Sequence, residues 1–96
     1  MPKIYLSPST QDWNPYVDGS GSEEYWMNLL ADALEPYLYA NTIAFVRNSP
    51  EMTAASSIAQ ANQLGGFDFY LALHSNASGE GQAGKNRGII VFYYPT

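Results

Sequence analysis

Apolar positions recur along the chain with two different periods, which predict alternating strands and helices. Short runs rich in β-branched and aromatic residues indicate four strands. These runs are residues 3–7, 42–47, 67–74 and 88–94. Between the first three runs, apolar residues recur every three or four positions, which indicates amphipathic helices after Ser22 and over 53–64. The order of elements is therefore β-α-β-α-β-β.

The helix boundaries carry recognisable signals. Ser22 is of the type that caps a helix N-terminus, and Glu23 and Glu24 follow in the first turn, where the helix dipole favours acids. Pro36 falls inside the periodic pattern and is expected to kink the first helix or to end its regular part nearby. Gly65 is a natural residue just after the end of the second helix.

This order of elements predicts an α/β protein with three layers and a mainly parallel sheet. Right-handed crossovers through the two helices make the first three strands parallel. The connection over 75–87 has no helical pattern, so the last strand is expected to return antiparallel. The run 67–74 is nearly continuous in apolar residues, which is typical of a central strand covered on both faces. Without an internal repeat or a linker, residues 1–96 are predicted to form a single domain.

Composition and charge exclude several classes of protein. The chain has nine acidic and four basic residues, and its net charge of −5 argues against binding to nucleic acid. No apolar run approaches the roughly 20 residues of a membrane span, and the first residues do not resemble a signal peptide. The absence of cysteine excludes disulfides and thiolate zinc sites.

The candidate chemistry centres on His74, the single histidine, at the end of the third predicted strand. Because ligands gather at the carboxyl ends of parallel strands, His74 should share an edge with the loop after Ser7 and with Glu23 at the start of the first helix. An imidazole and a carboxylate are ligands that zinc takes in catalytic sites. Two structural explanations remain open: His74 is a hydrogen-bonded residue of the fold, and Glu23 only compensates the helix dipole.

Several segments form a series that covers essentially the whole chain. They are Ile4-Tyr5-Leu6-Ser7-Pro8-Ser9-Thr10-Gln11, Asn14-Pro15-Tyr16, Glu23, Met27-Asn28, Arg47-Asn48-x-Pro50, Ala59-Gln60-Ala61-Asn62, Leu73-His74-Ser75-Asn76-Ala77 and the strand 88–94. This series resembles the start of zinc-dependent N-acetylmuramoyl-L-alanine amidases, more narrowly the clostridial branch that opens with a Ser-Pro-Ser-x-Gln segment.

The resemblance implies a hydrolase that cleaves peptidoglycan or muropeptides at the amide between muramic acid and L-alanine. It implies Zn²⁺ as the cofactor, with Glu23 and His74 as metal ligands, and Asn76 as a residue that orders the substrate loop. It also implies action in the cell wall or outside the cell, although this segment carries no signal peptide.

The chain departs from the family in two respects. No histidine follows the first predicted strand, where Gln11, Ser9 or a water remains as the third metal ligand. The glutamate that serves the family as general base lies beyond the length of this chain, and Glu80 is a solvated loop acid rather than its substitute. We therefore expect a truncated, partial amidase domain that is inactive alone and that self-associates through apolar surface left uncovered.

Two other classes of protein stay open. The chain is alternatively a non-catalytic peptidoglycan-binding module that stacks aromatic side chains on sugars. The candidate aromatic residues are Trp13, Tyr16, Tyr93 and Tyr94. It is otherwise an oligomeric structural half-domain without a ligand, in which Glu23 and His74 are incidental.

Overall fold

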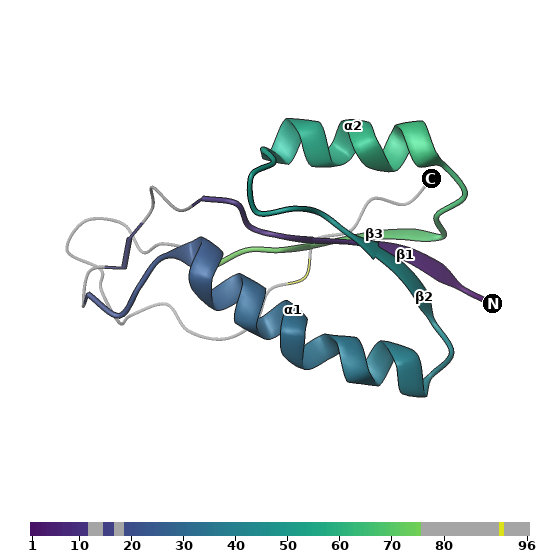
Figure 1. Ribbon diagram of the computed structural model, residues 1–96, viewed down its shortest axis with the longest axis horizontal. Helices are drawn as coiled ribbons and strands as arrows, with labels where there is room; N and C mark the ends of the chain where they lie inside the picture. Colours follow the sequence, from purple (N-terminus) through teal and green to yellow (C-terminus); the bar gives the residue numbers. More distant parts are fainter. Residues whose placement is uncertain (12–14, 17–18, 76–90, 92–96) are drawn as a thin grey trace.

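The part of the chain that the structure describes folds as an α/β unit around a parallel sheet of three strands (Figure 1). This confirms the predicted α/β class and the parallel direction of the first three strands. The computed structural model describes residues 1–11, 15–16, 19–75 and 91. Along the chain the elements are β1 (Lys3–Pro8), α1 (Glu23–Ala40), β2 (Ala44–Arg47), α2 (Ala54–Leu64) and β3 (Phe69–Leu73). Both neighbours of β1 run parallel to it, and the strand order is β2-β1-β3.

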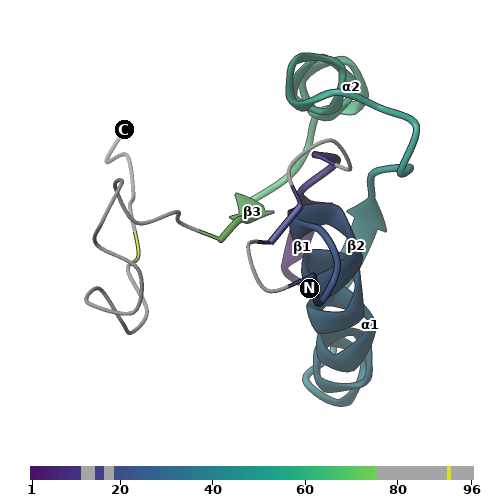
Figure 2. The same cartoon turned by 90° about the vertical axis from the view of Figure 1, so that its left-hand side faces the viewer.

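The two helices cover opposite faces of the sheet, which gives three layers (Figures 1 and 2). Successive side chains of a strand point to opposite faces, and β1 shows this alternation clearly. Leu6 packs with Ala31 and Leu38 of α1 in the hydrophobic core. The neighbouring Tyr5 is directed to the other face, where its hydroxyl donates to Gln60 of α2. The central strand is therefore apolar toward α1 and more polar toward α2.

In the described sheet the central strand is β1, whereas β3, which the sequence suggested as central, lies at one edge. Tyr5 and Leu6 of β1 are completely buried, whereas Phe69 of β3 is 50 % exposed. The cause is the arrangement of the crossovers. The connection through α1 runs over one face of the sheet, and the connection through α2 runs over the other (Figures 1 and 2). Because both are right-handed, the first places β2 on one side of β1, and the second leads the chain back past β1 to place β3 on its other side.

Several boundaries differ from the predicted ones. β1 runs on to Pro8, which pairs with Leu73 of β3. The second strand begins only at Ala44, because Thr42 has a positive φ of 57° in the turn after α1. α1 does not end near Pro36 but continues to Ala40. A proline costs a helix one hydrogen bond, and packing of α1 on the sheet tolerates this loss.

The helix caps follow the sequence closely. The Ser22 hydroxyl accepts from the Tyr25 backbone N–H at 3.2 Å and so caps α1. Thr53 and Ser56 form a reciprocal capping box on α2, in which each side chain accepts from the backbone of the other. Gly65 follows α2 with a positive φ of 66°. The Ser22 cap was predicted from the sequence, whereas the start of α2 was predicted from its periodicity alone.

The predicted fourth strand over 88–94 lies outside the described residues, apart from Val91, which is exposed. The strands that the structure describes are all parallel. Neither α1 nor α2 has the length and apolar character that a bilayer span requires.

Candidate functional site

The candidate site lies where the course of the chain through the sheet reverses. In the order β2-β1-β3, the connections from β1 and from β2 leave toward opposite sides. The carboxyl ends of β1 and β3 then form a switch point, the usual position of a ligand crevice in open α/β sheets. The Ser9 N–H donates to the Leu73 carbonyl at 2.9 Å, so the two strand ends stay paired up to this edge. Ser9 and His74 are therefore neighbours in space.

Glu23 is the buried charge of this edge. It is the first residue of α1 and only 2 % exposed. Its Oε1 accepts from the Ser75 backbone N–H at 3.2 Å and from the Ser75 hydroxyl at 3.0 Å. Its Oε2 accepts from the Ser9 hydroxyl and lies 3.2 Å from His74 Nδ1. The structure thus brings together the two residues that the sequence singled out as metal ligands.

The hydrogen bonds decide the charge state of Glu23. Burial by itself raises the pKa of the carboxyl group, because it penalises the charged form. The hydrogen bonds from Ser9, His74 and Ser75 act in the opposite direction and outweigh burial, so the pKa of Glu23 lies below its usual value. A carboxylate can only accept, so His74 Nδ1 carries the hydrogen that it shares with Oε2. Nε2 is then the ring nitrogen left for another partner.

Tyr16 and Ser75 extend this cluster of hydroxyl groups. The Tyr16 hydroxyl donates to Ser75 Oγ at 3.0 Å. Its backbone is held by a bridge between Pro15 and Ser22 and by its own N–H, which donates to the Gly21 carbonyl at 2.7 Å. Sequence reasoning assigned Tyr16 only as a possible sugar platform and gave Ser75 no role. The one signal was the position of Ser75 next to a candidate ligand.

A second group of polar residues supports Ser9 from the side of α1. The Ser9 carbonyl accepts from Asn28 Nδ2 at 3.3 Å, and Asn28 Oδ1 accepts from Arg47 at 2.9 Å. Arg47 also pairs with Asp32 and Glu35 of α1, each at 2.6 Å. Burial lowers the pKa of Arg47, but the hydrogen bonds that its guanidinium donates to these two carboxylates raise it further than burial lowers it. Arg47 thereby links the end of β2 to α1 through ion pairs and hydrogen bonds.

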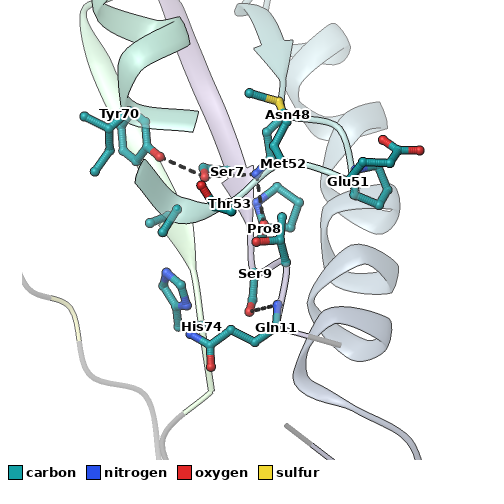
Figure 3. A pocket seen from close by; sticks show the side chains of 15 residues that line it. Ser7, Pro8, Ser9, Gln11, Asn48, Glu51, Met52, Thr53, Tyr70 and His74 are labelled. Carbon is teal, nitrogen blue, oxygen red and sulfur yellow. Dashed lines mark hydrogen bonds between the residues drawn. The ribbon is translucent and has the colours of Figure 1, made fainter. Parts of the chain in front are cut away.

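A cavity of about 560 Å³ opens beside His74 (Figure 3). It is lined by the end of β1, by the connection from β2 to α2 and by β3. Gln11 is part of its wall, and its side chain extends toward His74 in Figure 3. Glu51 also lines the cavity and lies away from His74 in the same view. The cavity has the size of a small-molecule site.

Asn48 lines this cavity and connects the elements around it through hydrogen bonds. Its side-chain amide nitrogen faces Ser7 Oγ and the Pro8 carbonyl at 3.2 Å and Ser57 Oγ at 3.0 Å. Asn48 is only 6 % exposed, and its Oδ1 is buried with no hydrogen-bond partner among the residues that the structure describes. The residue connects the end of β1 to α2.

Two of the described side chains, Glu23 and His74, have ligand atoms placed as in part of a zinc site. Neighbouring ligand atoms on a tetrahedral zinc ion, with bonds of about 2.0–2.2 Å, lie about 3.3–3.5 Å apart. The 3.2 Å between Glu23 Oε2 and His74 Nδ1 is close to this separation, so a metal ion could replace the shared hydrogen. Within the described part of the chain, no cluster of three histidine, cysteine or acidic side chains could hold a metal.

The other sequence predictions are placed as follows. Gln11 shares the cavity with His74, and its backbone N–H donates to Ser9 Oγ at 3.2 Å. Asn76 and Glu80 lie outside the described residues, as do the remaining candidate sugar-stacking residues. Those residues are Trp13, Tyr93 and Tyr94.

Comparison with known proteins identifies no relative. A scan against protein-family models finds no match, and searches of curated proteins and of solved structures find none.

Proposed function

We propose that this chain contributes the metal-binding edge of a zinc-dependent N-acetylmuramoyl-L-alanine amidase-type hydrolase domain. The observation that carries the proposal is the contact between the buried Glu23 carboxylate and the His74 imidazole, 3.2 Å apart at the switch point of the sheet. The segments that resemble this family come from the same elements. The substrate class is peptidoglycan or its muropeptide fragments, which places the protein's action at the cell wall.

The two ligands have complementary tasks. Glu23 provides a carboxylate, which hydrogen bonds from Ser9 and Ser75 keep ionised. His74 provides an imidazole nitrogen from the end of β3. These two residues would hold the zinc ion, which would supply Lewis-acid polarisation of the scissile carbonyl and activation of water. The cavity next to His74 receives the part of the substrate around the bond between the muramic-acid lactyl group and L-alanine.

For the fold, we propose that the segment 88–94 adds an antiparallel strand beside β3. In the described sheet β3 lies at an edge, and exposed edges of apolar strands favour pairing with a further strand. The connection over 75–87 shows no helical periodicity, which suits an antiparallel return better than a parallel crossover.

Zinc titration by calorimetry tests the metal site. The chain is expected to bind one Zn²⁺, and His74→Ala is expected to abolish this binding. The side chain of His74 is 45 % exposed, so its removal should leave the fold intact, which circular dichroism verifies. Glu51→Gln is the matched control, because Glu51 lines the same cavity but lies away from His74 (Figure 3).

Titration with a muramoyl dipeptide, with and without zinc, tests the substrate class. Binding that depends on zinc supports an enzyme-type site. Equal zinc binding by the wild type and by His74→Ala, or no binding by either, would overturn the proposal. Binding of the muramoyl dipeptide that is indifferent to zinc would instead favour a non-catalytic peptidoglycan-binding module.

A further inference from the structure

The carboxylate of Glu23 is held asymmetrically. Both donors of Ser75, its backbone N–H and its hydroxyl, bind the same oxygen, Oε1, at 3.2 and 3.0 Å. Oε2 receives the Ser9 hydroxyl and faces His74. One oxygen is thus occupied by Ser75, and the other is directed toward the imidazole.

The direction of the hydrogen bonds is fixed by chemistry. An ionised carboxylate has no hydrogen to give, so the Ser75 hydroxyl must donate to Glu23. Its oxygen lone pairs are then free to accept from the Tyr16 hydroxyl, which lies at 3.0 Å. The three groups form a relay in which Tyr16 donates to Ser75 and Ser75 donates to Glu23.

The relay joins three separate parts of the chain. Glu23 begins α1, Ser75 follows the end of β3, and Tyr16 comes from the connection between β1 and α1. The Tyr16 backbone is anchored independently, since its N–H donates to Gly21 and its carbonyl accepts from Gly19 at 3.1 Å. The Tyr16 backbone is therefore held by hydrogen bonds of its own, independently of the contact between its hydroxyl and Ser75.

We propose that Ser75 and Tyr16 are positioning residues that restrict Glu23 to metal binding through a single oxygen, Oε2. The inference rests on the proposed zinc site and adds to it the mode in which Glu23 binds. By holding Oε1, the relay keeps the carboxylate from rotating into a two-oxygen arrangement and keeps Oε2 next to His74. Outer-shell partners of this kind orient a ligand and tune its affinity for the metal.

Zinc affinities of a small set of variants test the relay. Ser75→Ala is expected to lower zinc affinity about 10- to 100-fold, the usual effect of losing an outer-shell partner. Ser75→Thr keeps the hydroxyl and is expected to restore most of the affinity. Tyr16→Phe is expected to lower it about 2- to 10-fold, as for one neutral hydrogen bond. Tyr37→Phe, an exposed tyrosine on α1, is the control and should bind like the wild type.

The double variant separates positioning from a general loss of structure. Because Tyr16 acts through Ser75, combining Tyr16→Phe with Ser75→Ala should be no worse than Ser75→Ala alone. Full additivity of the two effects, or unchanged zinc affinity in Ser75→Ala, would overturn the relay while leaving the proposed zinc site in place.

A metal-independent measurement decides the case in which the wild type binds no zinc. That outcome refutes the proposed function, and the relay is then judged by the His74 Nδ1–H signal in ¹⁵N–¹H spectra of the metal-free protein. The signal should be present in the wild type and in Tyr37→Phe, and weakened in Ser75→Ala. An identical signal in all three proteins would refute the relay.

Discussion

Replacing Glu23 by glutamine measures how strongly the buried carboxylate stabilises the fold. The described residues that bond to this side chain are all donors: Ser9, Ser75 and His74 each donate to it. Glutamine keeps the size but has only one acceptor oxygen. Because the Ser75 backbone N–H can only donate, we expect the remaining oxygen to face Ser75 and the amide nitrogen to face Ser9 and His74.

The magnitude follows from this rearrangement. Hydrogen bonds to a charged group are worth about 1.5–3 kcal/mol and neutral ones about 0.5–1.5 kcal/mol. Weakening the bonds at Ser75 and losing the one from His74 costs about 3–4 kcal/mol, and relief of charge burial returns about 1 kcal/mol. A net loss of about 2–3 kcal/mol is a large part of the roughly 5–14 kcal/mol expected for a chain of this length.

Thermal and urea unfolding give the readout, with Glu24→Gln as the matched control. Both glutamates lie in the first turn of α1, so both variants lose a similar interaction with the helix dipole. Glu23→Gln is expected to melt about 10–20 °C below the wild type, and Glu24→Gln within a few degrees of it. Equal melting temperatures of the two variants would show that the hydrogen bonds to Glu23 do not stabilise the protein.

Four further outcomes are expected. The pKa of Glu23 is lowered by folding, so the stability that it contributes is present above the ordinary glutamate value of 4.5 and is lost as the pH falls below it. Acid unfolding should therefore be steeper in the wild type than in Glu23→Gln; parallel curves would contradict this. Asn48→Ala should cost about 1–3 kcal/mol in urea unfolding, because it leaves the buried contacts to Ser7 and Ser57 unmade, and an unchanged midpoint would refute this role. The chain should self-associate through exposed apolar side chains such as Leu30, Tyr37 and Phe69. A mass by light scattering that stays at 10.6 kDa up to high micromolar protein concentration would exclude self-association. The family resemblance implies a general-base glutamate that residues 1–96 do not include, so these residues, incubated alone with purified peptidoglycan and Zn²⁺, should release no stem peptide. Loss of general-base catalysis costs about 10²–10⁴ in rate, and release at the rate of a complete amidase would contradict the expectation.

The sequence determined the local elements of this protein. Periodicity predicted both helices and the first three strands, and the capping residue Ser22 predicted where the first helix begins. These signals are readable because they depend on neighbours within one turn of the chain. The parallel direction of the strands also followed, because a helical crossover allows little else.

The sequence also predicted which two residues would meet at the candidate site. Glu23 and His74 are far apart in the chain, but each ends or begins an element at the carboxyl edge of the sheet. Topology alone was therefore enough to place them at one edge.

Only the tertiary structure decided which strand is central and how the carboxylate is held. The apolar run 67–74 suggested a central β3, yet among the described strands the opposite-face crossovers put β1 at the centre, and apolar content does not encode strand order. The roles of Ser9, Ser75 and Tyr16 were equally hidden, because a hydroxyl gains its function from the partner that folding brings to it. Helices, strands and caps can be predicted because they depend on residues close together in the sequence. Hydrogen bonds between side chains far apart in the sequence form only when the three layers pack together.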